Sequence, residues 1–249
     1  NNPIVDLQKN PDLWHVCNSA VVRVDGKYKG IFRVEYKDAT PTLIYGESED
    51  GINFTFGDEV TLVNEDGTPF YHEYAYDPRI IVLENEIYIV FCAEQYGTAI
   101  FIGKTKDFHT YTIVQRGFLP HNRNGVLFPE KFGDYYYMLS RPCNEGNCVG
   151  GLVYLSESTD LVHWGYHKYV TRQSDVGWNR WECVKIGPGP TPIKTKEGWL
   201  VIYHGVTATC NAWTYSFGVM LLDLKDPSKV IAKATRLLLA PEDIYKKTG

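Results

Sequence analysis

Four side chains that can carry positive charge stand beside glycine and proline in otherwise apolar segments. They are Arg123, Arg141, Lys185 and His204. A bound phosphate needs hydrogen-bond donors from several directions, and an arginine can donate two parallel bonds to it. If the four side chains point to one place they form an anion site, to which Asn124 and Tyr215 could add neutral donors. In the other interpretation each cation pairs with a nearby carboxylate, as Arg123 or Lys131 could with Glu130.

Asp77 is the leading candidate for an acid. It lies in the segment Tyr76-Asp-Pro-Arg79, and the proline that follows it pushes its backbone towards an extended conformation. The residues alone leave two roles open, a catalytic carboxyl group or a turn residue that caps the loop or pairs with Arg79. On local chemistry the turn role is favoured.

Short β-strands between polar turns must position these residues. Each candidate strand is rich in β-branched or aromatic side chains and is bounded by Gly, Asp, Asn or Pro. The strands are predicted at Ser19–Val24, Gly30–Glu35, Ile80–Leu83, Ile87–Phe91, Tyr135–Leu139, Leu152–Ser156 and Trp199–Tyr203. No segment keeps a helical apolar period, so we expect little helix beyond a turn near Pro241–Lys247.

A short motif recurs at intervals of roughly 50 residues, the length of a propeller blade. It consists of Ser or Thr, any residue, Asp, three residues and an aromatic side chain. The copies are Ser48–Phe54, Thr105–Tyr111 and Ser158–Trp164, with a weaker echo that begins at Asp223. We expect each aspartate to cap a tight turn through backbone N–H groups. The count of copies indicates about four blades.

Together the polar segments resemble glycoside hydrolase family 130, the β-mannoside phosphorylases, and most closely its β-1,4-mannooligosaccharide phosphorylase branch. The matching residues are Tyr76-Asp-Pro-Arg79, Asn122–Lys131, Ser140-Arg-Pro142, Lys185–Pro190, Tyr203-His-Gly205 and Thr209–Gly218. The resemblance runs from about Asn18 to the end of the chain. Several motifs in one order make it specific.

The resemblance implies an all-β fold, a five-bladed β-propeller that forms a single catalytic domain over residues 1–249. It also implies that the last blade is incomplete, because family members continue past the position of Gly249 with a stretch that completes it. We therefore expect the domain to be truncated at its C-terminus.

The resemblance also implies a role for each candidate residue. Asp77 matches the general acid of the family. The residues that match its phosphate-binding set are Arg123, Asn124, Arg141, Lys185, His204 and Tyr215. Those that fall where family members contact the sugar are Asn18, Ser19, Arg33 and Tyr76.

The implied reaction is inverting phosphorolysis of β-1,4-mannosides. Inorganic phosphate attacks the anomeric carbon of the non-reducing mannosyl unit and gives α-mannose 1-phosphate and a shortened acceptor. Mannooligosaccharides and mannosyl-N-acetylglucosamine both fit as substrates. One acid suffices, because phosphate is already an anionic nucleophile and needs no base, unlike the water of an inverting hydrolase. No metal or organic cofactor is implied, phosphate is a co-substrate, and a homo-oligomer is a state that the family allows.

The composition and charge of the chain argue against several other classes of protein. The chain has 249 residues, a net charge of -5 and 44% apolar residues. It lacks the basic balance of a nucleic-acid binder and any apolar run near the roughly 20 residues of a membrane helix. Its six cysteines are scattered and have no zinc spacing. We therefore expect reduced thiols and, with no signal sequence at Asn1, a cytoplasmic enzyme.

Three alternative functions stay open at this point. A β-mannoside hydrolase on the same fold would use water and would lack the cationic set. A non-catalytic carbohydrate-binding propeller would be indifferent to the change Asp77→Asn. An unrelated propeller with a protein partner would bind neither sugar nor phosphate. The cationic residues favour the phosphorylase over the hydrolase, and the unrelated propeller fits the sequence least.

Overall fold

The computed structural model describes residues 13–38, 40–116, 118–144, 150–174, 180–208 and 213–241. These residues form four sheets. The chain divides into two compact units, residues 1–119 and 120–249, and each unit holds two of the sheets.

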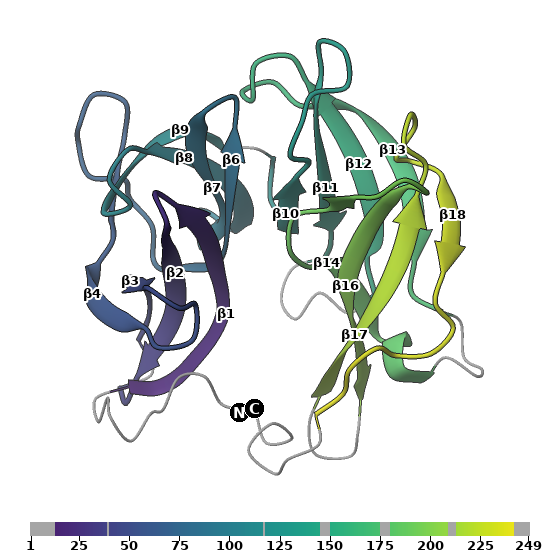
Figure 1. Cartoon of the computed structure of the whole chain (residues 1–249), viewed down its shortest axis with the longest axis horizontal. Coiled ribbons are helices and arrows are strands. Elements are labelled where there is room, and N and C mark those ends of the chain that lie inside the picture. The colour runs from purple at the N-terminus through teal and green to yellow at the C-terminus, as the bar shows by residue number, and fades with distance from the viewer. Residues whose placement is uncertain are drawn as a thin grey trace. The chain divides into compact units, whose positions relative to one another are not determined.

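The first sheet of the first unit is an antiparallel meander in the order β1-β2-β3-β4 (Figure 1). Its strands are β1 (Leu13–Val24), β2 (Lys27–Tyr36), β3 (Pro41–Ser48) and β4 (Thr55–Glu59). The second sheet has the order β5-β9-β8-β7-β6. Its strands are β5 (Thr61–Val63), β6 (Ala75–Leu83), β7 (Glu86–Glu94), β8 (Thr98–Thr105) and β9 (Thr110–Arg116). The short β5 pairs in parallel with β9 and extends the antiparallel meander of β6 to β9.

The second unit repeats this arrangement. Its first sheet contains β10 (Asn122–Leu127), β11 (Tyr136–Pro142), β12 (Leu152–Ser158) and β13 (Gly165–Arg172) in sequence order. Its second sheet has the order β14-β16-β17-β18, and β15 pairs with β16. The strands are β14 (Lys185–Pro188), β15 (Ile193–Lys194), β16 (Trp199–Ala208), β17 (Trp213–Leu222) and β18 (Val230–Lys233). A short 3₁₀ helix, η2 (Arg180–Glu182), leads into β14.

Each sheet is a meander of the kind that forms a propeller blade, so the all-β prediction is confirmed. The described residues contain four such sheets, and the expected number of five is wrong for them. The expectation of five blades came from the family resemblance, whereas the number of motif copies in the sequence indicated about four. The described residues include no helix long and apolar enough to cross a membrane. The turn predicted at Pro241–Lys247 lies, apart from its first residue, outside the described residues.

The recurring aspartate occupies the same turn in every sheet, between the third and fourth strands of the meander. In the first sheet Asp50 Oδ1 accepts hydrogen bonds from the backbone N–H groups of Ile52 and Asn53, each at 2.8 Å. The Asn53 N–H is the largest cause that holds the pKa of Asp50 well below its ordinary value. The same pair of backbone bonds recurs at Asp107, Asp160 and Asp223. The predicted turn role is therefore confirmed, and the weak echo at Asp223 is a true copy.

Each unit has its own hydrophobic core, shared by its two sheets. In the first unit Ile31 of one sheet belongs to the same buried cluster as Phe91 of the other. In the second unit the rings of Phe128 and Trp199 meet edge to face, with centres 5.2 Å apart. Burying one such side chain contributes about 1.5–3 kcal/mol. The core therefore holds the two sheets of each unit together, and with them the inner strands that carry the polar residues.

Of the four cysteines that the structure describes, one differs from expectation. Cys17, Cys92 and Cys183 have free thiols, and burial is the largest cause that raises the pKa of Cys17. Cys143, however, is half of a disulfide, so the expectation of reduced thiols is wrong there. Cys148 lies outside the described residues.

Candidate active site

Three of the predicted site residues lie at β-bulges in the first strand of a meander. The pairing of β1, β6 and β10 with the next strand shifts register at a predicted site residue in each, and β1 has a second shift near its start. The residues at these shifts are Asn18, Asp77 and Asn124, whose φ angles are 46°, 53° and 55°. Asn and Asp are the side-chain-bearing residues that best tolerate a left-handed backbone. A bulge changes the direction of a side chain within a strand. The same backbone feature therefore positions all three polar groups.

The carboxylate of Asp77 lies in a cluster built by both sheets of the first unit. Asn18 Nδ2 donates to Asp77 Oδ1 at 2.7 Å, and Arg33 Nη1 donates to the same oxygen at 3.1 Å. Arg33 also pairs with Glu35 at 2.8 Å, and its guanidinium lies 5.4 Å from the centre of the Tyr76 ring. Asp77 Oδ2 has no donor among the residues that the structure describes. That oxygen is therefore available to a ligand.

The local interpretation of Asp77 as a turn residue does not describe this arrangement. Arg79 Nη1 donates to the backbone carbonyl of Asp77 at 3.0 Å, whereas the carboxylate is held by Asn18 and Arg33 from the neighbouring sheet. Ser19 follows Asn18 at the bulge with an exposed side chain. It makes none of the contacts to Asp77.

The predicted phosphate-binding residues come together within the second unit. Arg123 of β10 is paired with Arg141 of β11 in the strand register. Arg141 links the two sheets of the unit, because its Nη1 donates to the carbonyl of Ile186 at 3.0 Å and lies 3.5 Å from His204 Nε2. An arginine can only donate, so this contact favours an unprotonated Nε2 on His204.

Lys185 reaches the same region from β14. Its Nζ lies 3.8 Å from the centre of the Trp213 ring and 5.7 Å from that of Tyr215. The Tyr215 ring lies in turn 5.7 Å from that of His204. Lys185 and Arg141 are both buried. Trp213 was not predicted as a site residue, and its only signal was its place in the Thr209–Gly218 motif, of which residues 209–212 lie outside the described residues.

Gly187 is the point at which Asn124 and His204 approach each other. A Cβ atom on residue 187 would stand 2.6 Å from His204 Cε1 and 2.7 Å from Asn124 Oδ1. Asn124 is buried, and its Oδ1 has no hydrogen-bond partner within the described part of the chain. A buried polar group of this kind is costly without a partner, so it is well suited to meet a ligand.

We expect Gly187→Ala to lower the free energy of unfolding by about 1–3 kcal/mol, because the added methyl group forces His204 and Asn124 to move. Urea denaturation measures this effect. Gly165→Ala is the matched control, since nothing lies within 4 Å of its added Cβ. Equal effects of the two substitutions would contradict the close packing of His204 and Asn124 on Gly187.

A buried carboxylate just before β14 was not foreseen from the sequence. Glu182 accepts a hydrogen bond from Tyr203 at 2.8 Å, pairs with Lys233 at 3.2 Å and bonds to Ser174. Burial, and then this carboxylate, raise the pKa of Tyr203. Glu182 ends the short helix that leads into β14. These bonds therefore fix the start of the strand that carries Lys185, and no spacing pattern in the sequence could have indicated them.

Glu130, the carboxylate that was considered as a partner for Arg123 or Lys131, has another partner. Its carboxylate pairs with Lys194 at 2.5 Å. Lys131 instead lies over the ring of Tyr136, with its Nζ 4.3 Å from the ring centre. The paired carboxylate that was considered for Arg123 and Lys131 is thus engaged by another residue.

The four blade-like sheets define a protein of the β-propeller class. The first unit presents a held carboxylate, and the second unit presents a set of cations. The model of glycoside hydrolase family 130, described as β-1,4-mannooligosaccharide phosphorylase, matches residues 5–249. The chain belongs to glycoside hydrolase family 130 and is an enzyme of the mannoside phosphorylase type.

The names of similar proteins state different glycosidic linkages. The β-1,4-mannooligosaccharide phosphorylase of Ruminococcus albus is 38% identical over 257 residues, which cover 100% of this chain and 75% of the relative. The 1,2-β-oligomannan phosphorylase of a Thermoanaerobacter species is 31% identical over 263 residues, or 98% of this chain and 82% of the relative.

Solved structures share the fold. The β-1,2-mannobiose phosphorylase of Listeria innocua, in complex with β-1,2-mannobiose, has a TM-score of 0.78 at 24% identity and covers 95% of this chain and 80% of its own. Another similar structure, with a TM-score of 0.76 at 20% identity, covers 94% of this chain and 74% of its own. It represents glycoside hydrolases of the family that target β-1,2 mannosidic linkages in Candida mannan.

Proposed function

We propose that this chain catalyses the inverting phosphorolysis of β-1,4-mannosides to α-mannose 1-phosphate and a shortened acceptor. Mannooligosaccharides and mannosyl-N-acetylglucosamine are the substrates that we consider. The observation that carries the proposal is the gathering of Arg141, Lys185 and His204 around Gly187 in the second unit. This is the donor set that a phosphate needs. The linkage is supported by the similarity to the Ruminococcus albus enzyme.

The first unit supplies the acid in this proposal. Asn18 and Arg33 hold Oδ1 of Asp77, which leaves Oδ2 to carry the proton that the leaving oxygen needs. The proton passes through the 3-hydroxyl of the mannosyl unit, as the family resemblance implies. Arg33 and Tyr76 flank the carboxylate and are the side chains that we assign to sugar contact, with Asn18 and Ser19.

The second unit supplies the phosphate-binding groups. Arg123 and Arg141 offer planar donor pairs, Lys185 adds a compact charge, and His204, Asn124 and Tyr215 complete the set. Held by them, a phosphate oxygen forms the new bond to the anomeric carbon while the bond to the acceptor oxygen breaks. Positioning of the nucleophile and neutralisation of its charge are the two contributions that these residues make to the rate.

Other properties stay predictions that accompany this function. They are a single catalytic domain over residues 1–249, phosphate as the sole co-substrate with no cofactor, a cytoplasmic location and assembly as a homo-oligomer.

The decisive experiment measures mannose 1-phosphate released from β-1,4-mannobiose with and without inorganic phosphate. We expect product only when phosphate is present. Free mannose that appears without phosphate would instead identify a hydrolase, the activity of other members of the family. Binding of the disaccharide without turnover would identify a binding propeller. A parallel reaction with β-1,2-mannobiose tests the linkage, and a faster reaction with it would contradict the β-1,4 assignment.

A further inference from the structure

Two exposed tyrosines of the first unit lie side by side outside the Asp77 cluster. Tyr71 is 59% exposed and Tyr96 is 85% exposed. Their ring centres lie 6.3 Å apart. Gln95 Nε2 donates to the backbone carbonyl of Tyr71 at 2.8 Å, and this bond ties the segment before β6 to the turn between β7 and β8. A pair of exposed rings fixed in this way is a feature of binding surfaces and adds little to a core.

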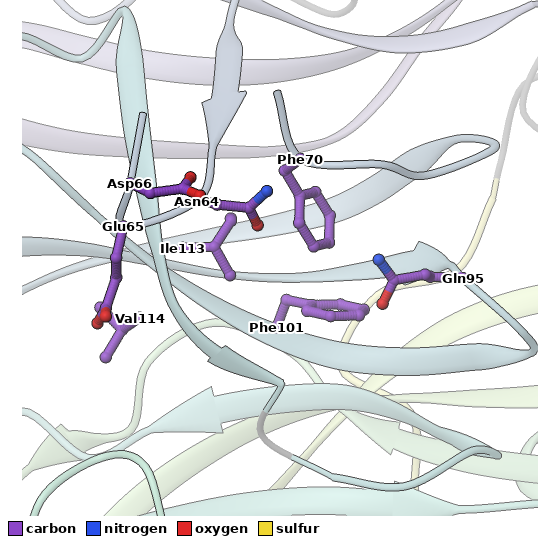
Figure 2. A pocket seen from close by; sticks show the side chains of 8 residues that line it. All are labelled: Asn64, Glu65, Asp66, Phe70, Gln95, Phe101, Ile113 and Val114. Atoms are coloured by element: carbon purple, nitrogen blue, oxygen red, sulfur yellow. The ribbon is translucent and has the colours of Figure 1, made fainter. Parts of the chain in front are cut away.

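The same unit contains a cavity of about 470 Å³ (Figure 2). Phe70 and Gln95, which directly precede the two tyrosines, are among its lining residues. Figure 2 shows the amide of Gln95 beside the rings of Phe70 and Phe101, with the side chains of Asn64 and Asp66 further along the cavity. An apolar floor with amide and carboxylate groups at its sides suits a hexose, which has apolar C–H faces and hydroxyl edges.

Two further tyrosines, Tyr74 and Tyr76, lie between Tyr71 and Asp77 in the sequence. Tyr76 directly precedes Asp77, and its ring centre lies 5.4 Å from that of Tyr74. The hydroxyl of Tyr74 donates to Glu94, the last residue of β7, at 3.4 Å. Since Tyr71 stands six residues before Asp77, their backbones can be at most about 20 Å apart. A chain of a few hexose units is therefore long enough to reach from Asp77 to Tyr71.

We propose that Tyr71 and Tyr96, with this cavity, form a distal subsite for the acceptor part of a β-mannooligosaccharide. The inference rests on the proposed function, in which the terminal mannosyl unit lies at Asp77 and every further unit belongs to the acceptor. The rings cover the C–H faces of a distant mannosyl unit, and the amide of Gln95 faces its hydroxyl groups. The subsite gives the enzyme a preference for longer substrates.

The test compares short and long substrates in the variant Tyr71→Ala/Tyr96→Ala. We expect kcat/KM for mannobiose to be unchanged and kcat/KM for mannohexaose to fall about tenfold, the loss expected for two stacking contacts. Replacement of both tyrosines by phenylalanine should restore most of the loss, because the stacking faces remain. Tyr166→Ala, at a residue that is 78% exposed in the second unit, is the matched control and should leave both substrates unaffected.

Binding of mannohexaose in the absence of phosphate separates this inference from the proposed function. Isothermal titration should show a Kd about tenfold higher in the double alanine variant. If phosphorolysis occurs but its dependence on chain length is the same in the variant, the subsite is overturned and the phosphorylase is retained. An equal loss on mannobiose and mannohexaose also overturns the subsite. If the tyrosines strengthen binding but no mannose 1-phosphate forms, the proposed function fails instead.

Discussion

Replacement of Asp77 by asparagine will lower kcat/KM for β-1,4-mannobiose by about 10²–10⁴-fold, the usual contribution of a general acid. The carboxamide has the size of the carboxylate, and its oxygen can still accept the hydrogen bonds of Asn18 and Arg33. What it cannot do is deliver a proton to the leaving oxygen. The loss should therefore lie in catalysis, and the unfolding transition in urea should change little.

A substrate that needs no acid distinguishes this role from a structural one. The dinitrophenyl leaving group departs as a stable anion, so the deficit of Asp77→Asn should shrink strongly with dinitrophenyl β-mannoside. A deficit of the same size on both substrates would show that Asp77 acts only through the geometry of the site. Asp58→Asn, at an exposed aspartate of β4, is the matched control and should retain full activity.

Replacement of Arg141 by lysine will raise the KM for phosphate by about 10- to 100-fold, the value of one or two hydrogen bonds to a charged group. Lysine keeps the positive charge but has no planar fork. Its three N–H donors share one nitrogen, so it cannot hold the Ile186 carbonyl and also present a parallel pair of donors to a ligand. Initial rates at saturating mannobiose and varied phosphate give this constant directly.

The control for Arg141 is Arg236→Lys, which changes an exposed arginine of the same unit. An unchanged KM for phosphate in Arg141→Lys would remove Arg141 from the phosphate site. A lower kcat at unchanged KM would instead assign it to the positioning of His204, which lies 3.5 Å from its Nη1.

Features that depend on neighbours along the chain could be predicted from the sequence. The turn aspartates could be predicted because Asp50 and its equivalents bond to backbone groups two and three residues further on. The strands could be predicted because runs of β-branched and aromatic residues between turn residues are local signals. The motif count also gave the four sheets, where the resemblance suggested five. The types and order of the polar segments were enough to indicate the family.

The contacts of the polar residues, in contrast, follow from the way the sheets pack. Local chemistry favoured a turn role for Asp77, yet its carboxylate is held by Asn18, which lies 59 residues away in the chain. The ring beside Lys185 and the bonds of Glu182 are likewise contacts between distant segments. Such contacts follow from the strand register and from bulges, which interrupt the alternation of side chains between the two faces of a sheet. Neither can be computed from the propensities of nearby residues, because both are set by the packing of one sheet against another.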